Sequence, residues 1–338
     1  QTQLSSSGHR IIIGIYTITN RRTMRQGKSA FYYTSIWHDG TEPLCDQAIV
    51  AVAARDKSKA AEFAKTYNIP KVFDSYEALA KSSDIDIAYI GVLNPFHYEL
   101  SKLYLENGKH VLCEKPLCLN AKQTESLIKL ATKKNLFFME AIWSRFSPGY
   151  LDLEKEIESG KLGELIYIHF CSKKEFGGSA ILDIGIYLLQ LSQYVFKEEP
   201  KKVTSVGVLG ETGVDVSESI ILEYSDGKRA VLNVEARLKL HNRATVYGTK
   251  GYPFHFPLAA TVSDGSLKPF PLHPSPIPYN FGPNSAGLVY QTLEVEKCIR
   301  AGKIESPRMS HKESLLLAKL MDTVRKQASD ACVYSDDV

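Results

Sequence analysis

Short apolar runs alternate with segments of helical periodicity from Gln47 to Glu140, and this alternation constrains the fold more than any other feature of the chain. Each strand-like run is followed by a stretch with apolar residues three and four positions apart, and the pattern then repeats. Strands joined in this way pair in parallel, with the connecting helices packed on the faces of the sheet. The sequence therefore predicts a doubly wound, Rossmann-like half.

The individual elements of this half can be placed along the chain. We expect strands at residues 48–54, 85–90, 110–113 and 136–140, and helices at residues 58–67, 75–81, 97–107 and 121–134. Gly108 stands where a glycine that ends a helix belongs. An apolar run at residues 10–18, which contains Gly14, is the candidate for the first strand.

After Trp143 the pattern changes to alternating polar and apolar residues. Strand-like runs are expected at residues 164–171, 202–208, 218–224, 229–236 and 244–247, with helices at 150–159, 289–301 and 311–328. Breaks such as Asp226-Gly227 are typical of hairpins, so this half should contain a large, mainly antiparallel open sheet. The Pro-rich residues 269–278 should form a loop. We thus expect an α/β chain with a Rossmann-like domain at residues 1–143, atypical in its first ~46 residues, and an α+β domain at 144–338.

Composition excludes several classes of partner. Lys and Arg number 41 against 38 Asp and Glu, without a long run of one sign, so nucleic acid is not expected as a partner. No apolar stretch approaches the roughly 20 residues of a membrane span, and residues 1–7 lack the apolar core of a secretory signal. The six scattered cysteines are typical of reduced thiols, which favours a cytoplasmic location. The nine histidines and the Cys113–Cys118 pair do not have the spacing of a metal site.

The tripeptide Glu114-Lys115-Pro116 directly follows an expected parallel strand. It should therefore lie at the carboxyl edge of the sheet, where open α/β folds bind ligands. Pro116 fixes φ and would turn the chain sharply, in one version through a cis peptide bond that aims Lys115 at the ligand. Lys115 is thus a candidate catalytic residue. The alternative interpretation is a surface lysine after a turn.

Asp183 and Tyr187 are four residues apart in an apolar stretch, so on a helix they share a face. A buried carboxylate needs a partner, and Lys115 is a candidate. A nearby cation lowers the pKa of a phenol from its ordinary ~10, which would suit Tyr187 as the general acid or base of an alcohol–carbonyl interconversion. The alternative interpretation is a carboxylate at a helix start followed by a half-buried tyrosine.

Several segments together resemble motifs of the glucose-fructose oxidoreductase/inositol dehydrogenase family: Ala53-Ala54-Arg55-Asp56, Ile90-Gly91 with Asn94 and His97, Glu114-Lys115-Pro116, Glu140-Ala141-Ile142-Trp143, Leu182-Asp183-Ile184-Gly185-Ile186-Tyr187 and Gly248-Thr249-Lys250-Gly251. The likeness runs from about residue 49 to the last helix. Within the family, the chain resembles a branch that oxidises trans-dihydrodiols of aromatic rings, or D-xylose, with NADP. Tyr187 discriminates this branch, because the sugar and inositol branches usually place His four residues after the Asp.

The resemblance implies specific roles for these residues. Lys115 and Tyr187 would be the proton-transfer pair, and Asp183 would orient the lysine or the substrate hydroxyl while a hydride passes from the small-molecule substrate to the nicotinamide. NADP would be contacted by seven residues: Arg55, Gly91, Asn94, His97, Glu114, Lys115 and Trp143. Arg55 would bind the 2′-phosphate, although it could equally be a solvated arginine, and Asp56 leaves room for NAD. Family members pair through the open sheet, so a homodimer is expected.

Two segments depart from the family pattern. The run at residues 10–18 continues as Thr19-Asn20-Arg21-Arg22, without the glycine-rich turn that approaches a pyrophosphate. Gly27-Lys28-Ser29 resembles the tail of a P-loop, but Arg22 stands where that motif needs its first glycine. The segment Cys171 to Phe176 is also short for the family. Two rival hypotheses therefore remain: a non-catalytic member that does not bind the cofactor, and an NAD-dependent enzyme that oxidises a sugar phosphate or inositol.

Overall fold

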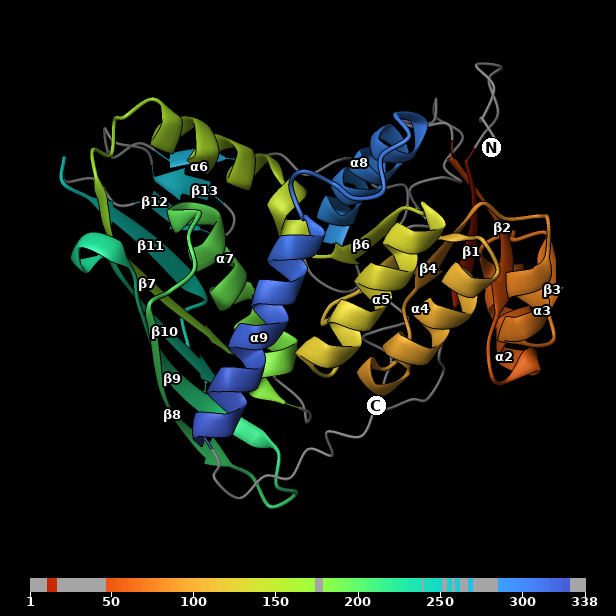
Figure 1. Ribbon diagram of the computed structural model, residues 1–338, viewed down its shortest axis with the longest axis horizontal. Helices are drawn as coiled ribbons and strands as arrows, with labels where there is room; N and C mark the ends of the chain where they lie inside the picture. Colours follow the sequence, from red (N-terminus) through yellow and green to blue (C-terminus); the bar gives the residue numbers. More distant parts are fainter. Residues whose placement is uncertain are drawn as a thin grey trace. The chain divides into compact units, whose positions relative to one another are not determined.

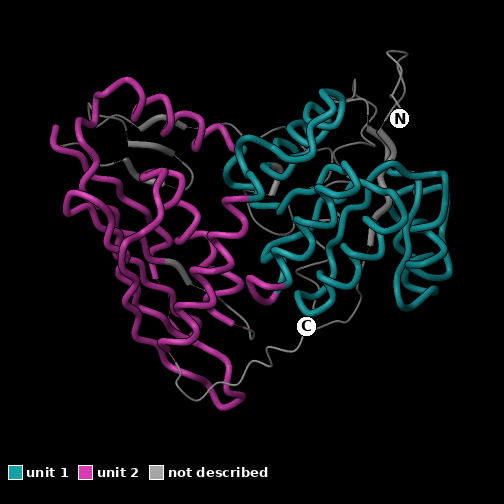
Figure 2. The backbone as a smooth tube through the Cα atoms, viewed as in Figure 1, with its two compact units in different colours: residues 1–118, 123–146, 272–311 teal, residues 119–122, 147–271, 312–338 magenta. Residues whose placement is uncertain are grey.

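The computed structural model describes residues 11–16, 47–173, 179–238, 240–250, 254–256, 259–261, 267–269 and 285–328. The chain divides into two compact units (Figure 2). Unit 1 comprises Gln1–Cys118, Gln123–Phe146 and Leu272–His311, and unit 2 comprises Leu119–Lys122, Ser147–Pro271 and Lys312–Val338. The units interleave along the chain, whereas the sequence division at residue 143 places everything after it in one domain. Helix α8 (Val289–Arg300) accordingly belongs to unit 1.

The described residues of unit 1 contain a six-stranded sheet in which every pair of neighbours is parallel. Its strands run in the order β3 (Lys71–Phe73), β2 (Gln47–Ala53), β1 (Ile11–Tyr16), β4 (Ile87–Ile90), β5 (His110–Glu114), β6 (Phe138–Ala141). From β1 to β3 the strands are added on one side of the sheet, and from β4 to β6 they are added on the other. The position between β1 and β4 is therefore the switch point at which such sheets bind ligands. The predicted Rossmann-like fold is confirmed.

Helices connect these strands: α2 (Lys57–Thr66), α3 (Tyr76–Lys81), α4 (His97–Glu106) and α5 (Ala121–Lys134). Short polar side chains begin two of them, because the Asp56 carboxylate accepts from the Ser58 amide at 3.0 Å and the Ser75 hydroxyl accepts from the Ala78 amide at 3.0 Å. Gly108 has a φ of +76°, so α4 is followed by the glycine in the left-handed region that the sequence predicts. Figure 1 shows α4 and α5 side by side.

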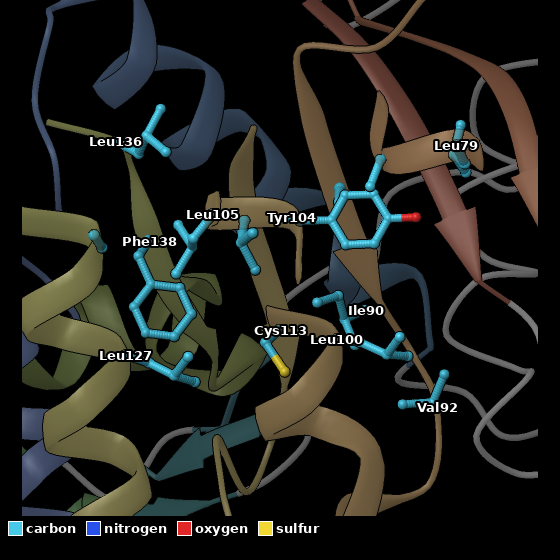
Figure 3. Close-up of a cluster of buried hydrophobic side chains, with 14 of the residues drawn as sticks. Leu79, Ile90, Val92, Leu100, Tyr104, Leu105, Cys113, Leu127, Leu136 and Phe138 are labelled. Carbon is cyan, nitrogen blue, oxygen red and sulfur yellow. The ribbon is translucent and has the colours of Figure 1, made fainter. Parts of the chain in front are cut away.

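The core of unit 1 lies between β4, β5, β6 and these helices (Figure 3). All four residues of β4 are buried, as expected for a strand covered on both faces. The labelled side chains come from the strands, from helices α3, α4 and α5, and from the segments next to β4 and β6: Leu79, Ile90, Val92, Leu100, Tyr104, Leu105, Cys113, Leu127, Leu136 and Phe138. Burial raises the pKa of the Cys113 thiol well above its ordinary value, so this cysteine contributes packing and not reactivity.

The described residues of unit 2 contain a second six-stranded sheet. Its strands run in the order β12 (Phe254–Phe256), β11 (Arg243–Gly248), β7 (Leu165–Lys173), β10 (Arg229–Glu235), β9 (Asp215–Glu223), β8 (Lys202–Leu209). Its neighbours are antiparallel except for β7 and β10, which pair in parallel with Tyr167 opposite Arg229. Strands β13 (Ala259–Thr261) and β14 (Leu267–Pro269) form a separate antiparallel pair. The mainly antiparallel sheet is confirmed.

In the part of the chain that the structure describes, helices cover one face of this second sheet and leave the other open. Helices α7 (Ile186–Phe196) and α9 (His311–Ala328) lie on the covered face, where the Ser205 amide of β8 donates to Gln327 Oε1 of α9 at 2.7 Å (Figure 1). Helix α6 (Pro148–Glu158) packs against α7, and the Tyr150 and Tyr194 rings meet edge to face. Burial alternates along β9, because Ile220 and Leu222 are buried whereas Ile221 is exposed.

In the part of the chain that the structure describes, no helix is long and apolar enough to cross a membrane.

Candidate active site

Lys115 follows the last residue of β5, at the carboxyl edge of the unit 1 sheet. The peptide bond between Lys115 and Pro116 is cis, in agreement with the version of the turn that the sequence suggested. We call residues 114–117 the Lys115 turn. The turn therefore lies at the edge where open parallel sheets bind ligands, and its last residue, Leu117, is part of the core of unit 1.

Side chains from three neighbouring segments hold the Lys115 turn. The Tyr89 hydroxyl of β4 donates to Glu114 Oε1 at 2.5 Å. His97, at the start of α4, is fully buried, and its Nδ1 lies 2.7 Å from the Pro116 carbonyl oxygen. Glu140 of β6 accepts from the Leu117 amide at 2.8 Å. Because each contact joins the turn to a different element, a shift of Lys115 would break buried hydrogen bonds.

His97 acts on this site through the backbone. Its second ring nitrogen, Nε2, lies 3.1 Å from the Val92 carbonyl oxygen, so the ring bridges the segment after β4 and the Lys115 turn. The side chain is fully buried between these two carbonyl groups. The predicted contact of His97 with the cofactor stays a prediction, whereas its position supporting Lys115 is a feature of the fold.

Gly91 and Asn94 lie in the segment that follows β4. A Cβ atom on Gly91 would lie 3.0 Å from Cε1 of Tyr89, so the glycine leaves room for the ring that binds Glu114. Asn94 begins the short 3₁₀-helix η1 (Asn94–Phe96), and its carbonyl accepts from the His97 amide. This segment lies next to the switch point of the sheet, where the backbone can approach a bound dinucleotide.

Arg55 follows β2 and is exposed. Its guanidinium carbon lies 4.9 Å from the centroid of the Phe96 ring, which limits the orientations of the side chain. The neighbouring Asp56 caps α2, with its Oδ1 accepting from the amides of Ser58 at 3.0 Å and Lys59 at 3.2 Å. The carboxylate is therefore engaged by the helix, and the arginine is the charged group presented at this point of the edge.

Trp143 begins the 3₁₀-helix η2 (Trp143–Phe146) after β6. A Cβ atom on Gly287, in the 3₁₀-helix η5 (Ser285–Leu288), would lie 3.0 Å from Cζ3 of the indole, so the ring packs directly on the glycine backbone. The same 3₁₀-helix is anchored by Arg145, a fully buried side chain that donates to the Arg308 carbonyl at 3.0 Å. Trp143 is thus held near the end of β6.

The other predicted catalytic residues lie in unit 2. Asp183 is in the π-helical turn η3 (Ile181–Gly185), and Tyr187 is in the first turn of α7, which continues from it. Both side chains are half-buried. A π-helical turn is rare and occurs often at functional sites, because it widens the helix locally and redirects side chains. Lys115 belongs to unit 1, so its pairing with Asp183 and Tyr187 remains a prediction.

The start of this helix is fixed by two polar side chains. The Asp215 Oδ2 of β9 accepts from the Ile181 amide at 2.7 Å, and the Ser179 hydroxyl accepts from the Leu182 amide at 3.0 Å. A Cβ atom on Gly185 would come within 2.4 Å of the Ile181 side chain, so the turn also depends on a glycine. These contacts fix the start of the helix that carries Asp183 and Tyr187.

Two comparisons of sequence bear on this arrangement. Residues 26–142 match the model of an oxidoreductase family with an NAD-binding Rossmann fold, and residues 150–252 match the GFO/IDH/MocA C-terminal domain. The trans-1,2-dihydrobenzene-1,2-diol dehydrogenase of Xenopus tropicalis is 40% identical over 304 residues, which cover 85% of this chain and 92% of that protein. The enzyme of the same name from Homo sapiens is 39% identical over 303 residues, which cover 85% and 90%.

The chain belongs to the GFO/IDH/MocA oxidoreductase family. Solved structures share its fold. A levoglucosan dehydrogenase in complex with NADH and levoglucosan aligns with a TM-score of 0.80 at 17% identity, covering 95% of this chain and 98% of that one. A 3-ketoreductase from Actinomadura kijaniata, in complex with TDP-benzene and NADP in an open conformation, aligns with a TM-score of 0.72 at 21% identity, covering 94% and 98%.

The described part of unit 1 fits the dinucleotide that this oxidoreductase family uses. The sheet has the strand order of a dinucleotide-binding domain, a glycine follows β4 at the switch point, and an exposed arginine follows β2. The predicted absence of a glycine-rich turn falls on residues 17–46, which lie outside the described residues. The short segment Cys171 to Phe176 is described only as far as Lys173, the last residue of β7.

Another motif of this GFO/IDH/MocA chain, Gly248-Thr249-Lys250-Gly251, has a structural role where it is described. A Cβ atom on Gly248 would lie 2.0 Å from the Leu162 carbonyl oxygen, and the Thr249 hydroxyl accepts from the Glu164 amide at 3.0 Å. The Lys250 ammonium donates to the Gly160 carbonyl at 3.0 Å. The motif therefore fastens the end of β11 to the turn that precedes β7.

Tyr89 and Asp215 support the candidate residues of this oxidoreductase, but the sequence did not indicate them. Each is a polar residue at or within an apolar segment, and a buried polar group normally has a hydrogen-bond partner. That signal says that a partner exists without saying which segment supplies it. The partners lie far away in the chain, so the pattern could not name them.

Proposed function

We propose that this chain is an NADP-dependent dehydrogenase that oxidises a secondary alcohol of an aromatic trans-dihydrodiol or of D-xylose. The observation that carries the proposal is the Lys115 turn, held by Tyr89, His97 and Glu140 at the carboxyl edge of a Rossmann sheet. It occurs in a chain 40% identical to a dehydrogenase named for a trans-dihydrodiol. An ammonium group carried by a well-anchored turn suits proton transfer at an alcohol.

Within this proposal, the protein binds and orients the substrate and moves its hydroxyl proton. Tyr187 accepts that proton at its phenolic oxygen, and the positive charge of Lys115 favours the phenolate form that can accept it. Asp183 orients the lysine or the substrate hydroxyl through its carboxylate. When bound, the nicotinamide supplies the hydride chemistry.

Binding of the cofactor is the first test, because it separates the proposal from a non-catalytic member of the family. Tryptophan fluorescence of the purified chain, followed during titration with NADPH or NADH, is expected to show saturable binding that is tighter for NADPH. Oxidation of trans-dihydrobenzenediol and of D-xylose with NADP is then measured by the absorbance of the reduced nicotinamide. A folded protein without saturable binding of either nucleotide would overturn the enzyme assignment.

Arg55 provides the matched test of the nucleotide preference. An arginine–phosphate contact contributes about 1.5–3 kcal/mol, so Arg55→Ala should weaken NADPH binding by roughly 10- to 100-fold and leave NADH binding nearly unchanged. Lys57→Ala is the control, because Lys57 is an exposed cation on the same segment that pairs with Asp74. Equal losses for both nucleotides in Arg55→Ala would contradict selection by Arg55 and favour the NAD-dependent alternative.

We also propose that the chain forms a homodimer through the open face of the unit 2 sheet. Apolar side chains are exposed on this face of neighbouring strands, with Val206 of β8 at 73% exposure and Ile221 of β9 at 40%. The rings of Tyr167 and Tyr247 contact each other at a tilt on the same face farther along, with centroids 5.8 Å apart. Exposed apolar side chains on one face of a sheet are typical of an interface.

The dimer can be tested with a charge placed on this face. Val206→Glu is expected to shift the mass measured by light scattering from dimer to monomer, because an unpaired carboxylate is costly to bury at an interface. Glu62→Lys changes an exposed residue of α2 and should leave the mass unchanged. A wild-type chain that runs as a monomer at micromolar concentration would contradict the proposal.

A further inference from the structure

Asp215 lies at the junction between the unit 2 sheet and the helix that contains Asp183 and Tyr187. It is 2% exposed, and its Oδ2 accepts from the Ile181 amide at 2.7 Å. The first amides of a helix have no acceptor within the helix, so a side-chain acceptor there fixes the start of the first turn. Asp183 and Tyr187 follow in the same continuous helix. Their positions therefore depend on Asp215.

Glu218 is a second buried carboxyl group on the same strand. The residue is fully buried, and neither of its carboxyl oxygens has a hydrogen-bond partner among the described residues. Its neighbours across the sheet are Gly207 on β8 and Val234 on β10, neither of which has a polar side chain. A Cβ atom on Gly207 would lie 2.5 Å from Glu218 Oε2, so the carboxyl group lies directly over that glycine.

The surroundings of Glu218 disfavour its charged form. Burial, and next the negative charge of Asp215, raise the pKa of Glu218 to about 8. The π-helical turn η3 packs on β9 and β10 and contributes Asp183, a further acidic residue. On β10, Glu235 is paired with Ser217 and lies on the other face of the sheet, where it bonds Arg237. On β8, Ser205 is bonded to the uncharged Gln327 of α9.

We infer that Asp215 is a positioning residue for Asp183 and Tyr187, and that Glu218 must keep its proton for Asp215 to hold the Ile181 amide. The inference rests on the proposed function, because it assigns a use to the helix that Asp215 anchors. Ionised Glu218 would place a second negative charge beside Asp215 in a buried site. The repulsion between the two carboxylates would move Asp215 away from the Ile181 amide, and the loss of this bond loosens the first turn.

Three variants separate the parts of this inference. Asp215→Asn keeps an oxygen that can accept from the Ile181 amide, so kcat should stay within about threefold of wild type. Asp215→Ala removes the acceptor and should lower kcat by roughly 10- to 100-fold, with little change in the KM for NADP. Glu218→Gln is the neutral mimic of the protonated acid. Its kcat should equal that of wild type at about pH 6.5 and exceed it by roughly tenfold at about pH 9.5.

Amide hydrogen exchange supplies a measurement that does not depend on activity. The protection factor of the Ile181 amide in wild type is expected to fall between about pH 7 and 9, whereas in Glu218→Gln it should stay constant. Leu189, in the middle of α7, serves as the internal control. Glu223→Gln is the matched variant, because Glu223 lies on the same strand but is paired with Lys202 at 3.0 Å, and it should behave as wild type.

The outcomes distinguish this inference from the proposed function. If the Ile181 protection factor changes with pH in wild type and not in Glu218→Gln, the carboxyl pair fixes the helix even in a chain that turns over no substrate. An equal pH dependence of that protection factor in both proteins would overturn the role of Glu218. A wild-type kcat in Asp215→Ala, in an active enzyme, would overturn the role of Asp215.

Discussion

Lys115→Met is expected to lower kcat by roughly 10²- to 10⁴-fold, the usual contribution of a positioned acid–base group. Methionine keeps an unbranched apolar stem and removes the ammonium charge that favours the Tyr187 phenolate. The backbone of the Lys115 turn is held by the side chains of Tyr89, His97 and Glu140, so the fold should survive. Steady-state turnover with NADP, together with thermal unfolding by circular dichroism, measures both quantities.

Lys109→Met is the control for this variant, because Lys109 flanks the same strand at its opposite end. The Lys109 ammonium donates to the Ile85 carbonyl at 2.9 Å, away from the carboxyl edge of the sheet. Its loss should cost about 1 kcal/mol of stability, the net contribution of one hydrogen bond, and leave kcat within a few-fold of wild type. A wild-type rate in Lys115→Met, or equal losses in the two variants, would contradict a catalytic role for Lys115.

The elements that the sequence predicted best are those in which one pattern of polar and apolar residues runs through the whole element. Helix α5 begins at Ala121 and ends at Lys134, and α9 runs over His311–Ala328, both as expected, because each has one apolar stripe and a long polar face. A strand was expected at residues 85–90, where nearly every residue is apolar, and the observed β4 covers the last four of them and is buried throughout. Local pattern was sufficient where a single periodicity decided the structure.

The parallel pairing of strands within the unit 2 sheet could not be predicted from the same pattern of polar and apolar residues. Alternation of polar and apolar residues shows that one face of a strand is buried, but it is identical for parallel and antiparallel neighbours. The pairing of β7 with β10 in parallel is decided by the long connection between them, which passes through α7 and the β8–β9 hairpin. The three-residue β3 was also not expected, because so short a segment has no periodicity.

The candidate site was predictable to the extent that it lies at strand ends. Lys115 was assigned from its place after β5, since the carboxyl ends of parallel strands share one edge. The contacts that hold Lys115 in place could not be predicted, because Tyr89 and Glu140 are 25 and 23 residues from their partners in the chain. Hydrogen bonds over such separations depend on packing geometry, which a single sequence does not specify.

Tyr187→Phe is expected to lower kcat by roughly 10²- to 10⁴-fold as well, because it removes the hydroxyl that exchanges the substrate proton and little else. The change of one oxygen atom on a half-buried ring should leave α7 and the unit 2 sheet folded. Tyr194→Phe is the matched control on the same helix. The Tyr194 hydroxyl lies 3.1 Å from the Tyr150 carbonyl oxygen, so its removal should cost about 1 kcal/mol of stability and leave kcat unchanged.

Tyr187→His then tests the chemical role itself. Imidazole can also exchange a proton, with an ordinary pKa of about 6.5 against about 10 for a phenol. If Tyr187 is the proton acceptor, the histidine variant should recover part of the rate lost in Tyr187→Phe, and the pH at which kcat rises to its plateau should move to a lower value. A merely structural tyrosine would give neither result, because packing alone does not change the pH dependence of turnover. The pH profiles of the three proteins with NADP as oxidant therefore decide whether Tyr187 moves the proton or only fills its place in the helix.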